Sequence, residues 1–186
     1  MLEQFHVPSD EEVRVDPDAM RQTVHEIFVS LGMSYEHAKQ STDVLLYADT
    51  RGIDSHGVSN MLRRYVEQIR DGVINVNPEW KIIREAAAVA TIDSDGAHGG
   101  VIGPEAMSIA IERAREYGVG AVTVLQGGHF GAAAYHAAMA LEHDMIGIAM
   151  TAGGVQVTPT FGAEALIGLN PIAVAIPTKN EPPFIF

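Results

Sequence analysis

The sequence predicts an α/β protein of the α+β kind, with a layer of helices followed by a mixed layer of strands and helices. Apolar side chains recur at helical spacing through residues 1–72, which is typical of amphipathic helices. Beyond them, short apolar runs of strand length alternate with helical segments, as in mixed α/β domains. The sharpest change lies near Gly72–Pro78. We therefore expect an N-terminal helical region over residues 1–72 and an α/β domain over residues 73–186.

The first region is expected to contain a polar lead over residues 1–15 and then three helices. Asp16-Pro17 supplies an N-cap followed by a proline at the first helical position, and Gly32 ends this helix. The second helix should span about 34–52 and the third about 58–70, the latter ending at an Asp-Gly turn. The apolar positions that should face a common core are Met20, Val24, Ile27, Phe28, Leu31, Ala38, Val44, Leu45, Ala48, Met61, Leu62, Tyr65 and Ile69.

Two helices and several strands are expected in the second region. One helix should begin at Gly103-Pro104 and end at Gly118. The other is rich in alanine, follows Gly127-Gly128 and should run to about His143. Strands are expected at residues 80–84, 88–93, 119–125, 146–151 and 172–176.

The last part of the chain combines turn-rich segments with an apolar end. Residues 158–162 and 168–171 lie between apolar stretches and are expected to be loops. The sequence finishes on Phe184-Ile185-Phe186, although termini are usually polar and exposed. We expect these three residues to open a strand, and the chain to be the first part of a longer protein.

Composition and charge exclude several classes of function. The chain carries 12 Lys and Arg against 24 Asp and Glu, a formal net charge of −12, which repels phosphate backbones and anionic lipid headgroups. The absence of cysteine removes disulfides, thiolate nucleophiles and Cys-ligated metals. The N-terminus has neither a secretory nor a transit pattern, and no apolar run approaches the roughly 20 residues that cross a bilayer. We expect a cytoplasmic protein without a nucleic-acid or membrane partner.

The most informative segment is Thr50–Ser59, which places His56 between a hydroxyl and a glycine just after a helix. An imidazole has an unperturbed pKa near neutrality, so it can accept or donate a proton at working pH. An alternative is that Asp54-Ser55 caps the next helix and that His56 lies in the first turn of that helix. The segment alone leaves both interpretations open.

A second candidate segment is Gly127–Gly131, with the sequence Gly-Gly-His-Phe-Gly between an apolar strand and a helix. Glycines permit close ligand approach, and the first amides of a helix are unpaired, so the segment would suit a phosphate or a carboxylate. A tight turn in which the glycines serve only the backbone geometry is the alternative.

Arg63 and Arg64 on the third helix could bind a substrate carboxylate through a guanidinium group, or could simply be solvated.

Other familiar chemistries lack their motifs. His129, His136 and His143 recur every seven residues, but on one helix this spacing separates them by roughly 10 Å. A zinc ion held by bonds of about 2 Å does not bridge that gap. The sequence contains no H-E-x-x-H, no G-x-x-x-x-G-K-[ST], no G-x-S-x-G, and no G-x-G-x-x-G after a strand. We therefore expect neither a metal centre, nor a serine hydrolase, nor an ordinary Rossmann domain.

From about Asp16 to Phe186, the motifs taken in order resemble the malate/L-lactate dehydrogenase family, which lacks the ordinary Rossmann fold. Members of that family include ureidoglycolate and sulfolactate dehydrogenases, diketogulonate reductase and piperideine-2-carboxylate reductase. The segments that carry the resemblance are ADTRGIDSHG at 48–57, GHFG at 128–131, TPTFG at 158–162 and GLNPIAVAIP at 168–177.

The resemblance implies a reversible hydride transfer between NAD(P)H and a 2-oxo or 2-imino acid, with NAD and NADP both open. It implies that His56 is the proton donor, that Ser55 supports it, and that His129 is a second catalytic candidate. It also implies a non-Rossmann cofactor-binding domain with a mixed, largely antiparallel sheet, and a homodimer with the active site near the subunit interface. The dinucleotide contacts that it implies are His129, Phe130, Gly131, Ala132 and Ala133.

Three departures from the family pattern matter. Leu169 replaces the threonine of the family's Gly-Thr-Asn-Pro, so a hydroxyl at this candidate cofactor contact is lost. Relatives often carry an arginine four residues after the histidine, where this chain has Asn60, and Arg63 or Arg64 is the candidate replacement. Relatives continue beyond the strand matching residues 184–186 into a further cofactor-binding segment. We therefore expect this chain to hold the proton donor but only part of the cofactor site.

Two functions of other classes stay open. One is a non-catalytic binding or assembly module, in which Ser55-His56 is only a helix cap and nicotinamide dinucleotides do not bind. The other is a metal-dependent hydrolase, which the histidine spacing disfavours.

Overall fold

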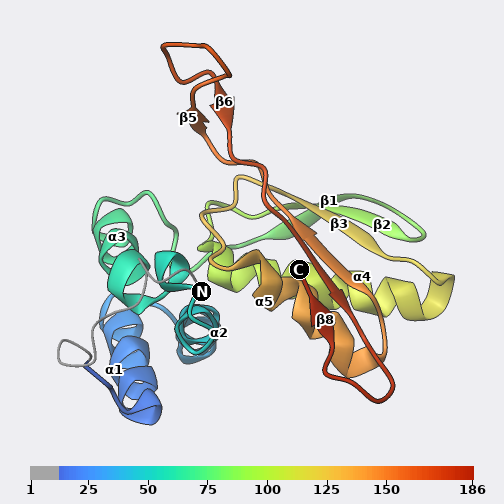
Figure 1. Cartoon of the computed structure of the whole chain (residues 1–186), viewed down its shortest axis with the longest axis horizontal. Helices are drawn as coiled ribbons and strands as arrows, with labels where there is room; N and C mark the ends of the chain where they lie inside the picture. Colours follow the sequence, from blue (N-terminus) through green and yellow to red (C-terminus); the bar gives the residue numbers. More distant parts are fainter. Residues whose placement is uncertain (1–12) are drawn as a thin grey trace.

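The computed structural model describes residues 13–186, so most of the polar lead expected over residues 1–15 lies outside the described residues. The helical layer consists of α1 (Pro17–Ser30), α2 (Tyr35–Asp49) and α3 (Val58–Arg70), which pack beside the strand-containing part of the chain (Figure 1). These bounds confirm the three expected helices. Their shared core contains Val24, Phe28, Met33, Ala38, Leu45, Leu46, Met61, Tyr65 and Ile74.

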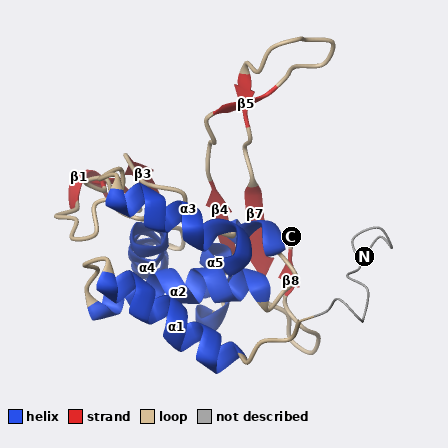
Figure 2. Ribbon diagram, turned by 90° about the vertical axis from the view of Figure 1, so that its left-hand side faces the viewer, coloured by secondary structure: helices blue, strands red, loops and turns tan. Residues whose placement is uncertain are grey.

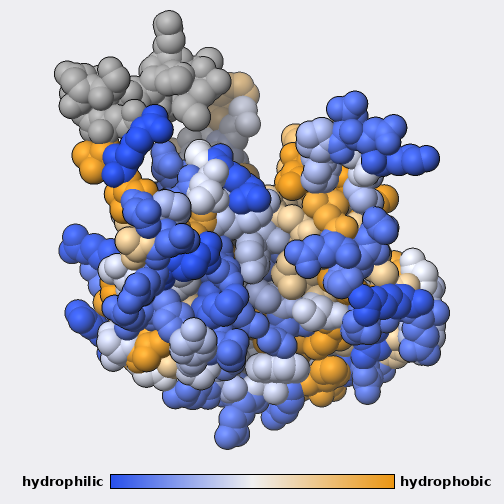
Figure 3. Space-filling view, turned by 90° about the horizontal axis from the view of Figure 1, so that it is seen from below, coloured by the Kyte–Doolittle hydropathy of each residue, from blue (hydrophilic) through white to orange (hydrophobic). Residues whose placement is uncertain are grey.

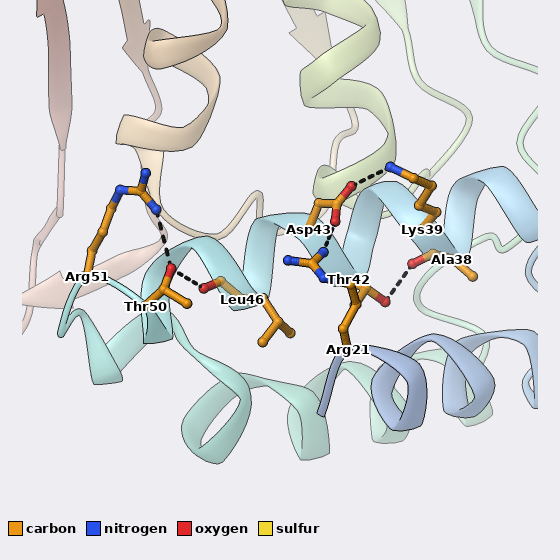
Figure 4. Close-up of polar contacts among 8 residues, drawn as sticks. All are labelled: Arg21, Ala38, Lys39, Thr42, Asp43, Leu46, Thr50 and Arg51. Carbon is orange, nitrogen blue, oxygen red and sulfur yellow. Dashed lines mark hydrogen bonds and ion pairs between the residues drawn. The ribbon is translucent and has the colours of Figure 1, made fainter. Parts of the chain in front are cut away.

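Ion pairs at the surface also join α1 to α2. Asp43 on α2 accepts hydrogen bonds from Arg21 on α1 and from Lys39 one turn earlier, the latter at 2.8 Å (Figure 4). Such pairs are exposed to solvent and contribute only about 0–1 kcal/mol each. The same view shows Thr50 turned back onto the Leu46 carbonyl at 2.8 Å, where α2 ends.

The start of α3 is capped by a side chain from α2 and not by the segment that precedes it. Asp49 Oδ2 accepts the Val58 N–H at 2.9 Å, while the N-cap residue, Gly57, has no side chain to offer. A Cβ on Gly57 would lie 1.9 Å from Asp49 Oδ1, so the glycine makes room for this cap. Asp54–His56 form a separate 3-10 turn, η2. The alternative in which Asp54-Ser55 caps α3 and His56 lies in its first turn is therefore wrong.

The first sheet combines antiparallel and parallel pairing. In the order β1-β2-β3, β1 is antiparallel to β2 and β2 is parallel to β3. The long helix α4 (Gly99–Tyr117) connects β2 to β3 and packs against this sheet around Ile92, Ala97 and Ile102. The strands are β1 (Lys81–Ala86), β2 (Val89–Asp93) and β3 (Ala121–Leu125).

Helix α4 begins at Gly99, four residues before the expected start at Gly103-Pro104. His98 is its N-cap, since the ring Nδ1 accepts the Gly100 N–H at 3.2 Å. Pro104 then lies inside the helix. A glycine-proline pair usually marks a helix start because an interior proline removes a hydrogen bond. Here the cap and the close packing of the glycine-rich first turn outweigh that preference.

The second sheet has one buried and one exposed face. It pairs β4, β7 and β8 antiparallel in the order β4-β7-β8. Ala149, Ala173 and Ala175 point toward the helix α5 (Ala133–Ala138) and are buried, whereas Ile148 and Ile172 are exposed. The apolar end of the chain forms a strand, as expected. The strands are β4 (Gly147–Met150), β7 (Ile172–Ile176) and β8 (Phe184–Ile185).

The alanine-rich helix is shorter than the sequence predicts. It ends at Ala138 and continues as a 3-10 helix, η3 (Met139–His143). His129 precedes α5, in the loop after β3, so the three histidines spaced by seven residues do not share one helix. Asp144, in a left-handed conformation with φ of 54°, ends this segment.

A narrow arm extends away from the rest of the chain between β4 and β7 (Figures 1 and 2). It contains the short antiparallel strands β5 (Val155–Val157) and β6 (Ile167–Gly168). The expected loop at 158–162 is observed, but the loop expected at 168–171 is wrong at its first residue, which belongs to β6. In the described part of the chain, four of the five strand pairings are antiparallel. This confirms the mixed and largely antiparallel α/β prediction, with the strands divided among separate small sheets.

The surface of the molecule is largely polar on the side viewed from below (Figure 3). The face shown in Figure 3 is mostly hydrophilic, with separate hydrophobic areas between the polar ones. Within residues 13–186, every helix is too short or too polar to span a membrane.

Replacing Asp49 tests the cap that joins α2 to α3. We expect Asp49→Ala to lower the free energy of unfolding by roughly 0.5–2 kcal/mol, because the first amides of α3 lose their acceptor. Asp54→Ala is the matched control and should change stability by less than about 0.5 kcal/mol. Urea denaturation of both variants measures the difference, and equal losses in the two would contradict this cap.

Candidate active site

The turn η2 presents His56 at the junction of α2 and α3. His56 is half-buried, and the exposed Ser55 places its Oγ 2.8 Å from His56 Nδ1. Asn60, one turn into α3, donates its side-chain N–H to the Ser55 carbonyl at 3.2 Å. The hydrogen bond from Asn60 therefore joins the turn to α3, and the contact with Ser55 Oγ orients the His56 ring.

The loop between β3 and α5 presents His129. The Gly128 N–H donates to the Ala97 carbonyl at 2.9 Å, which fixes the loop against the start of α4. Gly131 adopts a left-handed φ of 73°, and a Cβ there would lie 2.4 Å from Val44 Cγ1 on α2. A side chain at 131 would thus be disfavoured by both conformation and space. Gly131 therefore serves the backbone geometry of the loop, and binding of an anion by this segment stays a prediction.

The fold brings the two candidate histidines together from distant parts of the sequence. The rings of His56 and His129 stack with centroids 5.5 Å apart and an angle of 22° between their planes. Neither ring lies fully in the interior, since both are half-buried. The stacked histidines form a face on which two imidazoles can contact the same small molecule. We call His56 and His129 the histidine pair.

Hydrogen bonds to His129 define which nitrogen carries its proton. The Gly131 N–H donates to His129 Nδ1 at 3.2 Å, so this nitrogen is an acceptor. The Tyr65 hydroxyl lies 2.7 Å from the same atom and is therefore a second donor to it. In the neutral ring the proton consequently resides on Nε2.

Burial keeps these groups uncharged. Desolvation, together with the nearby His56 and Arg64, lowers the pKa of His129 to about 4. Desolvation also lowers the pKa of His56 below 6.5, and it raises the pKa of Tyr65 well above 10. At neutral pH His129 is thus a neutral N–H donor, and Tyr65 is a phenol and not a phenolate.

The candidate substrate residues on and near α3 have different surroundings. Arg63 is highly exposed and pairs with Glu67 at 3.0 Å, which matches the alternative of a solvated arginine. Arg64 is also exposed but has no ion pair or hydrogen bond with any residue that the structure describes. Its charge is close enough to influence both Tyr65 and His129. Asn60 is engaged with the backbone of η2. Arg64 is therefore the available cation beside the histidine pair.

The candidate cofactor residues fall into two groups. Phe130 follows His129 directly, and its ring stacks on His136 at 4.7 Å. Ala132 is the N-cap residue of α5, and Ala133 is its first residue. Leu169 lies elsewhere, at the base of the arm, where its carbonyl accepts the Gly153 N–H at 2.7 Å. The structure thus groups His129 through Ala133 but places Leu169 on a separate segment.

Two surface hollows lie along α4 and not at the histidine pair. One, of about 260 Å³, is lined by residues such as Tyr135 and His143, and the other, of about 740 Å³, by residues such as Glu105 and Tyr117. Neither is lined by His56 or His129. Among the described residues, no three His, Asp or Glu side chains are grouped as metal ligands.

Sequence reasoning missed Tyr65 and His98 as polar parts of the site. Tyr65 was expected as an ordinary core position, although a tyrosine among apolar residues carries a hydroxyl that needs a partner when buried. His98 carried no motif at all. Its signal is a histidine directly before two glycines that begin a helix.

Comparison with known proteins identifies the family. The sequence model of the malate/L-lactate dehydrogenase family matches residues 15–186. The chain is 47% identical over 170 residues to malate dehydrogenase of Pyrococcus abyssi, covering 91% of this chain and 47% of that protein. It is 33% identical over 169 residues to ureidoglycolate dehydrogenase (NAD(+)) of Escherichia coli K12, covering 91% of this chain and 48% of the relative.

Solved structures agree with this assignment. Malate dehydrogenase from Pyrococcus horikoshii OT3 superposes with a TM-score of 0.93 at 40% identity, covering 100% of this chain and 53% of that one. Sulfolactate dehydrogenase from Methanocaldococcus jannaschii gives 0.87 at 36% identity, covering 92% and 49%. The chain belongs to the malate/L-lactate dehydrogenase family. It spans about half the length of the curated relatives that it matches.

Removing the Tyr65 hydroxyl tests how His129 is held. We expect Tyr65→Phe to raise the pKa of His129 by about 0.5–1 unit, because the lost hydrogen bond stabilises the neutral ring. Histidine titration by NMR measures the shift. Tyr35→Phe, at an exposed tyrosine outside the site, is the control and should leave His129 unchanged. An unaltered His129 titration in Tyr65→Phe would show that the phenol does not hold the ring.

Buried histidines should make the fold sensitive to mild acid. Desolvation lowers the pKa of His98 to about 3 and that of His136 to about 4. As the pH falls below about 6.5, these histidines become protonated in the unfolded chain but stay neutral in the native fold. The free energy of unfolding therefore declines toward pH 4, by up to about 1.4 kcal/mol per ring and pH unit. Urea denaturation between about pH 7 and pH 5 measures this slope, which His98→Asn should reduce. The same slope in both proteins would rule out His98 as a source.

Proposed function

We propose that this protein transfers a hydride between NAD(P)H and a 2-oxo or 2-hydroxy acid, with His56 as the proton donor and acceptor. The observation that carries the proposal is the stacking of His56 on His129, from a turn and a loop that are distant in sequence. Family membership supports the reaction class, and the name of the Escherichia coli relative includes NAD(+). NAD and NADP are both kept as candidate cofactors.

The residues present fit a nicotinamide dinucleotide and a small carboxylic acid in their chemistry. The loop that carries His129 is rich in glycine, so its backbone can approach a ligand closely. It also carries the aromatic ring of Phe130 and the neutral N–H of His129. Arg64 supplies a positive charge without an ion pair among the described residues. A guanidinium binds carboxylates through two parallel hydrogen bonds, so we assign Arg64, ahead of Arg63 and Asn60, to the substrate carboxylate.

The two histidines have different protonation properties and therefore different roles. When bound, NAD(P)H would supply a hydride to the carbonyl carbon of the substrate. Because burial favours the neutral ring, His56 takes up a proton before the reduction. From this protonated form, Nε2–H donates its proton to the carbonyl oxygen and leaves a neutral imidazole, while Ser55 Oγ accepts a hydrogen bond from Nδ1–H and orients the ring. His56 acts in reverse as a base when the hydroxy acid is oxidised.

His129 is better suited to polarise the carbonyl than to protonate it. Its pKa of about 4 leaves it neutral at working pH. Its Nε2–H can still donate a hydrogen bond to an oxygen on which negative charge develops. We therefore keep His129 as a second catalytic residue with an electrostatic role. Phe130, Gly131, Ala132 and Ala133 are proposed dinucleotide contacts, with Leu169 as a further one from the arm.

The homodimer implied by the family resemblance is also a proposal. Sedimentation equilibrium of the protein carrying residues 1–186 tests it directly. A monomer at all concentrations would remove the dimer without affecting the proposed chemistry.

Replacing His56 tests the proposed proton transfer. In the protein that carries residues 1–186, we expect oxidation of NAD(P)H by a panel of 2-oxo acids. We expect His56→Ala to lower kcat by about 10²–10⁴-fold, the usual contribution of a positioned acid or base. His143→Ala, at an exposed histidine outside the site, is the matched control and should retain turnover. Loss of reduced nicotinamide absorbance measures the rate.

Cofactor binding separates this proposal from a non-catalytic binding module. Calorimetric titration with NADH and NADPH should show saturable binding that weakens in His129→Ala. Turnover unaffected by His56→Ala would remove His56 from the mechanism. The complete absence of dinucleotide binding would favour the module.

A further inference from the structure

His98 is a buried histidine that the proposed chemistry does not use. It precedes α4 and is 1% exposed. Its Nδ1 accepts the Gly100 N–H at 3.2 Å and lies 2.9 Å from Ser41 Oγ on α2. Because the amide donates to Nδ1, the neutral ring carries its proton on Nε2. That nitrogen is buried and has no hydrogen-bond partner within residues 13–186.

The ring of His98 contacts two aromatic side chains. It meets Tyr65 edge to face, with centroids 4.4 Å apart and an angle of 80° between the planes. Phe28 lies 5.8 Å away, tilted by 46°. Tyr65 is itself 1% exposed. Its ring is therefore fixed on the side of His98, and its hydroxyl is the end that reaches His129 at 2.7 Å.

Helix capping alone does not explain a histidine at this position. Serine, aspartate and asparagine are the usual N-caps and bury no ring. An apolar side chain would pack in the same interior without leaving a polar atom unpaired, which has an energetic cost. The feature that these residues do not reproduce is a flat ring that contacts Tyr65 while its own edge is held by Ser41 and the α4 backbone.

We propose that His98 is a positioning residue for the active site, acting through Tyr65 to hold His129 in one orientation and one tautomer. The order of contacts is Ser41 and the Gly100 amide to His98, His98 to Tyr65, and Tyr65 to His129. The proposal rests on the proposed function, in which His129 Nε2–H faces the substrate. Catalytic side chains need orientations held within roughly 10–20°, and a buried aromatic contact supplies that restraint.

A double-mutant cycle on the protein carrying residues 1–186 tests this order of contacts. His98→Asn keeps an N-cap for α4 and removes the ring. We expect it to raise the pKa of His129 by about 0.5–1 unit, a three- to tenfold change in proton affinity, because Tyr65 no longer holds its hydrogen bond. It should also give His129 a mixed tautomer in ¹⁵N NMR. In the Tyr65→Phe background, the same substitution should add nothing.

The charged and titratable groups that face His129 are His56 on η2, Arg64 and Tyr65 on α3, and His98 before α4. A general loosening of the site would also shift the titration of His56. An unchanged His56 titration in His98→Asn therefore indicates that the effect on His129 passes through Tyr65. His98→Phe, which keeps a ring but loses the cap, should lower stability while preserving the His129 tautomer.

Three results would overturn the proposal. One is an unchanged His129 pKa and tautomer in His98→Asn. Another is a full additional shift when His98→Asn is combined with Tyr65→Phe. If His98→Asn does not fold, Ser41→Ala is measured instead, since it frees one edge of the ring, and an unchanged His129 there overturns the proposal. Because these readouts need no turnover, their failure is distinct from a failure of the proposed hydride transfer.

Discussion

The position of the histidine pair depends on a backbone-to-backbone contact between the start of α4 and the loop before α5. A Cβ on Gly99 would lie 2.5 Å from the carbonyl oxygens of both Gly128 and His129. No flexible side chain lies between these segments to absorb a change in their spacing. The Gly128 N–H, bonded to the Ala97 carbonyl, fixes the same contact from the other side. This contact fixes the spacing between the loop and the start of α4, and His129 in the loop contacts Tyr65 and stacks on His56.

The interior beneath this contact is more polar than stability alone requires. His98 and His136 are both almost fully buried, and each has a ring nitrogen without a partner in the described part of the chain. Buried polar groups of this kind cost free energy that an apolar side chain would not. His136 also donates from Nε2 to the Phe130 carbonyl at 2.7 Å, so it orders the loop that carries the site. The two buried rings thus lower the free energy of unfolding, while they order Tyr65 and the loop that carries His129.

Local signals in the sequence predicted much of the fold. Asp16-Pro17 and the glycine and Asp-Gly stops were enough to define three helices, and strand-length apolar runs located five strands to within a few residues. His56 was named from its neighbouring residues, and His129 from the resemblance to the family. What the sequence did not show was their contact, because stacking depends on how α2, α3 and α4 pack. The cap of α3 by Asp49 was missed because its partner, Val58, lies nine residues away. The early start of α4 was missed although its cap is local, because histidine is not among the usual N-cap residues.

The hydrogen bonds at His129 make the ring a one-sided proton carrier. Nδ1 already accepts from two donors, so Nε2 is the nitrogen that remains to exchange a proton with a ligand or with solvent. Burial raises the pKa of Tyr65 and lowers that of His129, so transfer of the phenol proton to Nδ1 is disfavoured. The phenol thus fixes the tautomer of the ring while keeping its own proton at neutral pH.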